Sequence, residues 1–298
     1  LWLFAVAKSL SEELALDLEI KDFEKFKGKN FLNLDYKNKR NTLLKSSIKN
    51  FIIFNERVYY DSELKYIVSS FDERVLSISK NTILEGIFQS EKYFFGNLDK
   101  LKRYIKLESS IKKINKISPY TCILNIRGGE YKRHKNFILP KKYWENAMRN
   151  FRDRWGINDF IIVTDDYKYS HALFPKLEII YGDISRCYSA IHNCKNIIVS
   201  NSSFSYFPCK TGLKKNVIAP MYWARPSKSK GRWISPGNIY KDWHWQNKKS
   251  NLISYEKCLE IAKKTEEFYK SEFTILIDKK QLPKMGVLNF IPRKYKLF

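Results

Sequence analysis

The chain has 298 residues, 44% of them apolar and 15% aromatic, and this composition excludes a largely disordered protein. Its 55 Lys and Arg outnumber 31 Asp and Glu, which gives a net charge of +24. Such an excess draws a protein toward an anionic partner, namely nucleic acid, a membrane surface or a phosphorylated substrate. The alternative is that the charge reflects a lysine-rich composition on a solvated surface.

The five cysteines form no Cys-x-x-Cys pair and no regular framework. We therefore expect a reducing cytoplasm, mostly buried cysteines and no zinc site. No apolar run reaches the roughly 18 residues that span a bilayer, and the opening residues lack the basic leader and cleavage site of a signal peptide. Because the chain begins at Leu1 rather than Met, we expect some of the natural N-terminus to be absent.

The first part of the chain has a mixed pattern. Its predicted elements are a helix at 1–16, strands at 18–20 and 51–54, a mixed segment at 63–71 and a helical region at 82–107. A basic, polar stretch at 112–116 precedes the first strong strand. We therefore place a domain boundary near residue 115, between an N-terminal domain of residues 1–115 and a C-terminal domain of residues 116–298.

The second part of the chain alternates strand and helix. Apolar, β-branched runs predict strands at 122–126, 160–163, 177–181, 196–199 and 216–219. Helical patterns occupy 141–155, 168–173, 184–194 and 204–210, and a further helix and strand are predicted at 255–268 and 273–277. This alternation is typical of parallel βαβ units, so we expect an α/β, Rossmann-like domain that binds a nucleotide at the carboxyl ends of its strands. The helix at 255–268 is expected to pack back on the first domain.

An arginine–glycine turn follows the first of these strands. Residues 125–131 read Asn-Ile-Arg-Gly-Gly-Glu-Tyr. A guanidinium binds phosphate through two hydrogen bonds, and glycines let backbone N–H groups approach a ligand closely. The alternative is an ordinary turn with an incidental arginine.

A serine-rich segment follows the strand at 196–199. Residues 200–205 read Ser-Asn-Ser-Ser-Phe-Ser and open a predicted helix. Hydroxyl and amide groups at the start of a helix bind anions, although serine and asparagine also favour helix caps without any ligand.

An aspartate pair follows the strand at 160–163, where residues 164–166 read Thr-Asp-Asp. Asp165 and Asp166 could hold a divalent metal or accept hydrogen bonds from a purine base, and a helix cap is the third possibility. Metal is the weaker choice because no further acidic cluster lies nearby. Three strand ends of one sheet thus carry groups suited to a base, a ribose and a diphosphate.

Five segments resemble glycosyltransferase family 11, the α-1,2-fucosyltransferases. Residues 125–131 look like the family motif His-x-Arg-Arg-Gly-Asp-Tyr, and 200–207 resemble its Ser-Asn-Ser-Ser-Phe-Ser-Trp-Trp segment. Residues 86–94, Gly-Ile-Phe-Gln-Ser-Glu-Lys-Tyr-Phe, are similar to the Gly-Tyr-Trp-Gln-Ser-Glu-Lys-Tyr-Phe of many bacterial members. Residues 217–223 also fit, and 1–16 resemble the family's first helix, so the resemblance runs in order across most of the chain. In the first motif, Asn125 stands in place of His, Gly128 in place of the second Arg, and Glu130 in place of Asp.

The resemblance implies a GT-B fold of two Rossmann-like domains, GDP-fucose as donor, inversion at the anomeric carbon, and no metal or other cofactor. It implies an N-terminal acceptor-side domain and a C-terminal domain that binds the GDP-sugar. By position, Arg127 would bind the diphosphate, Ser202 and Ser203 would support it, and Asp165 or Asp166 would face the guanine. The full donor-binding set is Asn125, Arg127, Asp165, Asp166, Ser202, Ser203 and Phe204. Arg127 would also act in catalysis, and Glu130 is the candidate base for the acceptor hydroxyl.

Other functional-looking residues fit structural roles better. The four histidines are not expected to be bases: they are His134 in a basic run, His171 and His192 on predicted helices, and His244 in an aromatic loop. The tryptophans at 233, 243 and 245 are expected to pack rather than to stack on sugars. The basic and apolar residues 290–298 could touch an anionic membrane surface or close the fold.

Three hypotheses for function follow. The first is a cytoplasmic α-1,2-fucosyltransferase that acts on a galactose-terminated oligosaccharide or lipid-linked glycan of an O-antigen or capsule. Peripheral contact with the anionic inner membrane stays open as an addition to this hypothesis. The second keeps the GT-B fold and uses another GDP-sugar. The third is a basic nucleic-acid-binding protein, prompted by the net charge of +24 and by 19 Tyr and 20 Phe. Spread basic residues and the lack of a nucleic-acid motif disfavour the third.

Overall fold

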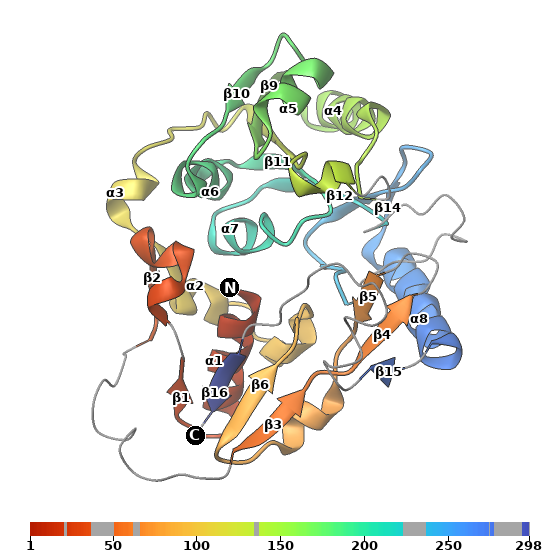
Figure 1. The fold of residues 1–298 in the computed structure, drawn as a ribbon. Helices are drawn as coiled ribbons and strands as arrows, with labels where there is room; N and C mark the ends of the chain where they lie inside the picture. The colour runs from red at the N-terminus through yellow and green to blue at the C-terminus, as the bar shows by residue number, and fades with distance from the viewer. Residues whose placement is uncertain are drawn as a thin grey trace.

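The computed structural model describes residues 1–20, 23–36, 51–61, 66–133, 137–222, 237–273, 275–276 and 294–297. It is a mixed α/β protein in which a seven-stranded sheet with its helices occupies the upper half of Figure 1. Smaller sheets, built from both ends of the chain, occupy the lower half. His134 and Trp233 lie outside the described residues.

The large sheet has the strand order β10-β9-β8-β11-β12-β13-β14. Its strands are β8 (Thr121–Ile126), β9 (Asp159–Thr164), β10 (Glu178–Ile180), β11 (Asn196–Val199), β12 (Asn216–Pro220), β13 (His244–Gln246) and β14 (Leu252–Ile253). Neighbouring strands run parallel except for β14, which is antiparallel to β13. All five strands predicted in this region are confirmed, whereas His244 lies in β13 and not in the predicted loop. The reason is that His244 pairs with Ile218 of β12, which extends the sheet by one strand.

Helices cover both faces of this sheet because successive strand residues point to opposite sides. Leu124 packs in the cluster that holds α4 (Lys141–Trp155) and α5 (Tyr167–Leu173). Its neighbour Ile123 packs in the cluster that holds α6 (Ile184–Asn193) and α7 (Tyr206–Thr211). From β8 the chain winds outward to β9 and β10, then returns to β11 on the other side of β8. Strand order therefore reverses between β8 and β11, and ligands of doubly wound sheets bind at such a switch point.

Most of the remaining elements build the lower half, whereas α3 (Ser109–Lys112) packs against α6 of the upper half (Figure 1). The others are α1 (Trp2–Glu13), β1 (Leu18–Glu19), η1 (Phe23–Lys25), η2 (Lys27–Asn30), β2 (Leu32–Leu34), β3 (Ile52–Asn55), β4 (Val58–Asp61), β5 (Tyr66–Ser69), η3 (Glu73–Ser77), β6 (Thr82–Glu85), η4 (Glu91–Phe94), α2 (Lys100–Tyr104), β7 (Ile105–Leu107), α8 (Tyr255–Glu272), β15 (Ile275–Leu276) and β16 (Lys294–Leu297). The short helix η5 (Glu130–Arg133) belongs to the upper half. The small sheets have the orders β1-β16-β6-β3, β15-β4-β5 and β2-β7.

The predicted helical region at 82–107 is wrong for most of its length. Residues Thr82–Glu85 form β6, which pairs in parallel with β3 and antiparallel with β16. Ser90 then caps η4, and both Phe95 (φ 50°) and Gly96 (φ 74°) adopt left-handed backbone conformations that end the turn. Apolar spacing alone suggested a helix, but strand pairing with distant segments and these turn residues divide the region.

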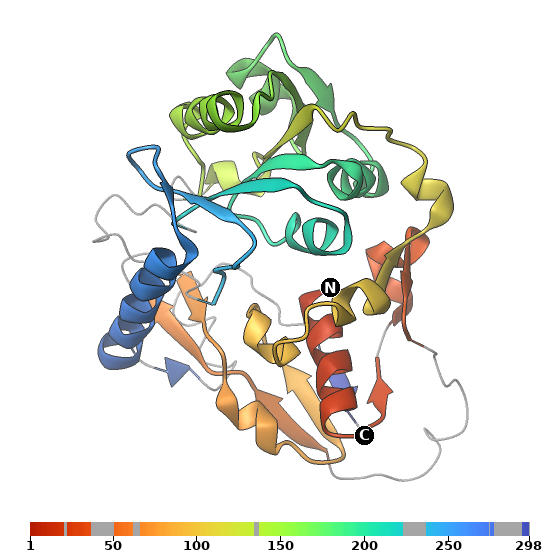
Figure 2. The same ribbon diagram turned by 180° about the vertical axis from the view of Figure 1, so that it is seen from behind.

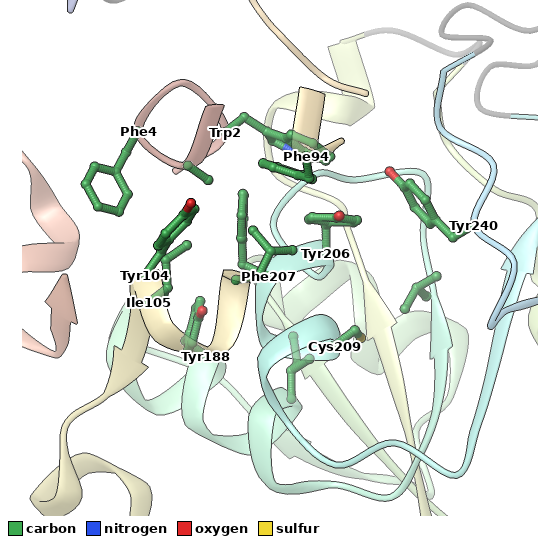
Figure 3. Close-up of a cluster of buried hydrophobic side chains, with 14 of the residues drawn as sticks. Trp2, Phe4, Phe94, Tyr104, Ile105, Tyr188, Tyr206, Phe207, Cys209 and Tyr240 are labelled. Atoms are coloured by element: carbon green, nitrogen blue, oxygen red, sulfur yellow. The ribbon is translucent and has the colours of Figure 1, made fainter. Parts of the chain in front are cut away.

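The two halves share one hydrophobic core, shown in Figure 3. Trp2 of α1 stacks on Tyr206 of α7 with ring centroids 4.2 Å apart, and it also packs on Phe207 and Phe94. Helix α1 is buried on nearly every side, as its apolar sequence requires. This core contains residues from both sides of position 115, so it does not mark a boundary there. The domain boundary near residue 115 stays a prediction.

The chain returns to its N-terminal half after the large sheet. Helix α8 places Tyr269 against Tyr59 of β4, and the Tyr269 hydroxyl donates a hydrogen bond to Asp61 (3.1 Å). Strand β16 lies between β1 and β6, so the backbone of residues 294–297 closes a sheet. No helix among the described residues is both long and apolar enough to cross a membrane.

The buried aromatic and cysteine residues match the sequence expectations. Trp243 and Trp245 are buried, which confirms that they pack. All five cysteines are buried and free. Burial raises the pKa of the Cys209 thiol to about 12 and that of Cys187 to about 11, so these thiols are inert structural residues.

Candidate active site

A cavity of about 310 Å³ opens where β8 and β11 end, at the switch point of the large sheet. Five side chains beyond these two strands line the cavity. Arg127 and Glu130 follow β8, and Ser202, Ser203 and Phe204 follow β11. All five were predicted as site residues from the sequence. The structure therefore brings together two segments that lie about seventy positions apart in the chain, because their strands are neighbours.

Arg127 is held in place from several sides. Its Nη1 lies 3.0 Å from Oδ2 of Asp165, and its guanidinium lies over the rings of Tyr131 (5.6 Å) and Phe204 (6.0 Å). The side chain is only 20% exposed. Among the described residues, its Nε has no hydrogen-bond partner although it is buried. A guanidinium fixed in this way keeps donors free for an anion in the cavity.

The two glycines after Arg127 allow two turns to pack together. A Cβ on Gly128 would lie 2.7 Å from the Cβ of Asp166, and one on Gly129 would lie 2.5 Å from Oδ2 of Asp165. The Gly128 N–H also donates to Asp165 Oδ1 (2.9 Å). The sequence suggested that the glycines let a ligand approach the backbone. In the structure it is the Asp165-Asp166 turn that approaches them closely.

Asp165 and Asp166 both have partners within the protein. Asp165 pairs with Arg127, whereas Asp166 caps α5 through the Tyr169 N–H (3.1 Å) and pairs with Lys132. Burial raises the pKa of Asp166, but the hydrogen bonds from Lys132 and Tyr169 outweigh burial and lower it overall. Neither aspartate lines the cavity. Their expected role toward a base stays a prediction, and the helix-cap alternative describes Asp166.

The serine segment forms a compact turn before α7. Ser200, Asn201 and Ser202 are buried, whereas Ser203 and Phe204 are half-buried. Ser202 Oγ accepts the Phe204 N–H (3.3 Å), and the Tyr131 hydroxyl donates to the Asn201 carbonyl (3.1 Å). The helix predicted at 204–210 begins at Tyr206, so the serines lie in the turn rather than within the helix.

Asn125 and Glu130 lie at opposite extremes of exposure. Asn125 is buried within β8, where its Nδ2 donates to the Val163 carbonyl (3.3 Å), and it does not line the cavity. Glu130 is 73% exposed at the cavity mouth, with Oε1 4.0 Å from Arg127 Nη2. Of these two side chains, only that of Glu130 is therefore open to a substrate hydroxyl.

The facing wall of the cavity was not found by sequence reasoning. It is largely aromatic and comes from α1, the η1–η2 segment, α6 and α7: Trp2, Phe26, Phe31, Tyr188 and Phe207. No motif marks Phe26, Phe31 or Tyr188. Trp2 and Phe207 lie in segments that resemble the family, but nothing in the sequence assigned them to the cavity, because each reads as ordinary core. Their convergence follows only from the packing of α1 against α7.

The motif-like segment 86–94 ties the two halves together. Glu91 accepts a hydrogen bond from Tyr206 (2.9 Å) and lies 2.8 Å from Lys210 Nζ, both of α7. Lys210 also pairs with Asp242, and its ammonium lies over three rings: Tyr206 (5.8 Å), Tyr240 (4.9 Å) and Trp243 (5.7 Å). We call this group the Lys210 cluster. It fixes the helix that follows the serine turn.

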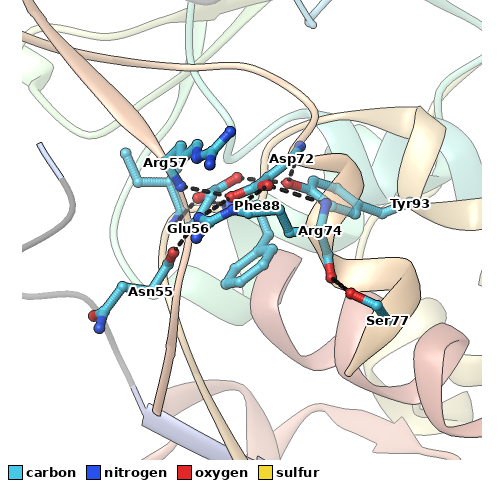
Figure 4. Close-up of polar contacts among 9 residues, drawn as sticks. Asn55, Glu56, Arg57, Asp72, Arg74, Ser77, Phe88 and Tyr93 are labelled. Carbon is cyan, nitrogen blue, oxygen red and sulfur yellow. Dashed lines mark hydrogen bonds and ion pairs between the residues drawn. The ribbon is translucent and has the colours of Figure 1, made fainter. Parts of the chain in front are cut away.

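A second polar cluster includes residues of the same segment (Figure 4). Glu56 is buried and accepts hydrogen bonds from the N–H groups of Ile87 (2.6 Å) and Phe88 (2.7 Å) and from the Tyr93 hydroxyl (2.9 Å). Tyr93 in turn accepts the Asp72 N–H (3.0 Å). Burial raises the pKa of Glu56 to about 7, and the hydrogen bonds only partly oppose this shift.

We expect Glu56 to make stability depend on pH. From pH 4.5 to about 7 the unfolded carboxyl ionises while the folded one keeps its proton, so the free energy of unfolding falls by up to about 3 kcal/mol. Glu56→Gln resembles the protonated form and should lack this fall. Urea titrations of both proteins across this range measure it, with the exposed Glu108→Gln as control. Parallel pH profiles for Glu56→Gln and the unmodified protein would disprove an uncharged Glu56.

Among the described residues, no group of three or more His, Cys, Asp or Glu side chains lies together in a way that could hold a metal ion. His171 and His192 lie on helices α5 and α6, as predicted. Burial lowers the pKa of His192, which does not line the cavity.

Comparison with known proteins identifies the family. A search of solved structures matches POFUT1 in complex with GDP (crystal form III) at 13% identity over 42% of this chain and 48% of that one, and its TM-score of 0.31 is too low to bear on the fold. The O-antigen biosynthesis glycosyltransferase WbnK of Escherichia coli is 29% identical over 179 residues, 55% of this chain. This match spans 57% of the relative's length. The sequence model of glycosyl transferase family 11 matches residues 19–233, more than half of the chain, so the chain belongs to glycosyl transferase family 11.

Proposed function

We propose that this chain is an inverting glycosyltransferase that moves L-fucose from GDP-fucose to a galactose-type hydroxyl, in α-1,2 linkage. The observation that supports it most is Arg127, fixed beside Ser202 and Ser203 at the switch-point cavity of a family 11 chain. The name of the E. coli relative supports a bacterial surface glycan as acceptor. The free, buried cysteines fit a reducing cytoplasm as the place of reaction.

The proposed architecture is of the GT-B type, with the donor bound by the large sheet and the acceptor by the other half. The doubly wound order of the large sheet supports the donor side. The aromatic wall of Trp2, Phe26 and Phe31 supports an acceptor side, because sugar rings pack well on aromatic faces.

Arg127 would act on the leaving group. As the bond between the sugar and the diphosphate breaks, negative charge grows on the diphosphate, and a guanidinium already in place stabilises that charge without reorganising. Asp165 and the rings of Tyr131 and Phe204 fix the orientation of the guanidinium. Asp165 is therefore a positioning residue in this mechanism.

Glu130 is the proposed base for the acceptor hydroxyl. Its carboxylate stands at the cavity mouth and is 73% exposed, so it can reach an incoming hydroxyl. The proton would pass to Glu130 as the oxygen attacks the anomeric carbon from the face opposite the diphosphate. Attack from that face inverts the anomeric configuration.

A transferase that uses another GDP-sugar is the second candidate. It is favoured by one observation: Gly128 packs tightly against Asp166 at the position where the resembled motif has a second arginine. A screen of GDP-sugars for transfer to galactose-terminated oligosaccharides, followed by linkage analysis of the product, separates the two candidates.

We expect GDP to raise the melting temperature of the protein, while UDP and CMP do not. Arg127 could bind the diphosphate of GDP or of UDP, but the proposed donor carries guanine, so the base should decide which nucleotide binds. Thermal unfolding at matched nucleotide concentrations measures the effect, since a ligand that binds the folded state stabilises it by mass action. Equal shifts with GDP and UDP would contradict the assignment of GDP.

We also expect sugar transfer to persist in EDTA. In the proposal, the guanidinium takes the role that a divalent cation would have at the diphosphate. Transfer rates are measured with and without chelator, and then with added magnesium or manganese. Activity that disappears in EDTA and returns with either metal would assign the diphosphate to a metal instead.

A further inference from the structure

A second hollow, of about 730 Å³, lies at the opposite edge of the large sheet from the candidate active site. Its lining comes from α2, β7, α3, the segment before β8, and the residues just before β11 and β12. The hollow thus lies at the amino ends of β8 and β11, and Arg127 and Ser202 follow the carboxyl ends of the same two strands. We call this hollow the lysine groove. It is separate from the cavity described above.

Six lysines and no carboxylate line the lysine groove. Lys102 pairs with Asp99, whereas the other five form no ion pair within the part of the chain that the structure describes. Lys106, Lys112, Lys113 and Lys116 are exposed. Lysines that line one hollow with no carboxylate among them create a positive local potential, which attracts an anionic partner.

The groove is held in shape by hydrogen bonds between its two walls. Asn193 of α6 donates from Nδ2 to the carbonyls of Lys112 (2.6 Å) and Asn115 (2.7 Å). Ser189 of the same helix donates to the Ile111 carbonyl (2.8 Å). The yellow segment that carries α3 therefore lies against the large sheet's helices, as Figure 2 shows. The backbone that carries Lys112 and Lys113 is therefore fixed against α6.

Exposed apolar side chains accompany the lysines. Leu213, in the loop before β12, is 71% exposed and lines the groove. Ile114 (51% exposed) and Tyr120 (76% exposed) lie on the segment that runs from α3 to β8. Leucine and isoleucine side chains would contribute little to binding the phosphate backbone of a nucleic acid. The surface of a bilayer, however, accepts both kinds of side chain, with lysines at the headgroups and apolar groups at the acyl boundary.

We propose that the lysine groove docks the protein on a bilayer surface rich in anionic phospholipids. Lys106, Lys112, Lys113 and Lys116 contact headgroup phosphates, and Leu213 and Ile114 enter the interfacial layer. This inference is independent of the proposed sugar transfer, because the groove and the active-site cavity share no residue. Docking by this edge leaves the active-site cavity at the other edge of the sheet uncovered.

Vesicle co-sedimentation with the full chain tests this proposal. We expect binding to vesicles of equal parts phosphatidylglycerol and phosphatidylcholine, and weak binding to phosphatidylcholine alone. Binding should collapse near 1 M salt, where the Debye length is about 3 Å. The groove variant changes Lys106, Lys112, Lys113 and Lys116 to Glu. Since each lysine near such a surface contributes roughly fivefold to affinity, the loss should be about 100-fold or more.

The matched control carries the same change of charge elsewhere. It replaces Lys142, Lys176, Lys249 and Lys263, which are exposed and lie outside the groove, by Glu. The control should keep most of its vesicle affinity. Equal losses in both variants would show that only net charge matters and would overturn the proposal.

Two further measurements distinguish membrane docking from misfolding of the variant and from binding of nucleic acid. Thermal melts show whether the groove variant folds, and if it does not, the corresponding Lys→Gln variant replaces it. Leu213→Ser should weaken vesicle binding several-fold without changing the net charge. The proposal would be overturned if the unmodified protein bound RNA tightly and did not bind vesicles. If the groove variant then lost the RNA binding and Leu213→Ser kept it, the groove would be assigned to nucleic acid.

Discussion

Arg127→Ala is expected to lower sugar transfer by roughly 100- to 1000-fold, which corresponds to about 2.7–4 kcal/mol of transition-state stabilisation. Asp165 and two aromatic rings fix the guanidinium, whereas Lys27, which also lines the cavity, is exposed. Gly128 offers no second cation beside Arg127. Arg127→Lys should recover little, because an ammonium cannot reproduce two parallel hydrogen bonds to phosphate. Turnover and GDP affinity of both variants measure the effect.

The fold should survive the loss of Arg127. Asp165 keeps the hydrogen bond from the Gly128 N–H, and its side chain is 28% exposed, so it is not left as a buried, unpaired charge. Arg154→Ala, in an exposed part of α4, is the matched control and should leave turnover unchanged. Near-normal turnover of Arg127→Ala would rule out a role at the diphosphate. A collapsed thermal melt would show instead that the arginine only holds its turn.

Lys210→Met is expected to destabilise the protein by roughly 3 kcal/mol. Its side chain is 5% exposed and that of Glu91 is 18% exposed, so the change leaves a largely buried carboxylate without its cation. Removing one partner of a buried pair costs roughly 3–5 kcal/mol. The lower end applies here because Glu91 keeps the hydrogen bond from Tyr206. Urea denaturation at neutral pH measures the free energy of unfolding.

Two comparisons isolate the buried pair. Lys257→Met breaks an exposed pair with Glu260 and should cost less than about 1 kcal/mol. The double variant Glu91→Gln with Lys210→Met removes both charges and should be more stable than Lys210→Met alone. If Lys210→Met proves no more harmful than Lys257→Met, the Lys210 cluster does not hold the halves together.

The large sheet could be predicted closely because its signals are local. Each of the five predicted strands is a short apolar run bounded by turn residues, and in the structure most of their residues are buried. The position of Arg127 and Ser202 followed from the rule that parallel strands end at one edge. Five of the residues predicted for the site, Arg127, Glu130, Ser202, Ser203 and Phe204, line one cavity.

The other half could not be predicted in the same way, because its elements are defined by partners far along the chain. Residues Thr82–Glu85 form a strand only because β3 and β16 flank them. Glu56 and Lys210 read as surface charges in the sequence, and nothing local signals their burial. The aromatic wall of the cavity could not be predicted either, because its residues come from segments far apart in the chain. Trp2 resembles any other apolar helix residue until α7 packs against it.

The position of β16 has a consequence for the order in which the molecule assembles during synthesis. The strands of the large sheet lie within one continuous stretch, residues 121–253, which can pair as soon as that stretch is made. The four-stranded sheet, in contrast, has β1 and β6 on either side of residues 294–297. Strand β1 is therefore synthesised well before the strand that pairs with it, and β1 and β6 each carry an unpaired edge until residues 294–297 are made. Such edges are exposed to aggregation, so a chaperone that shields them would improve the yield of folded protein.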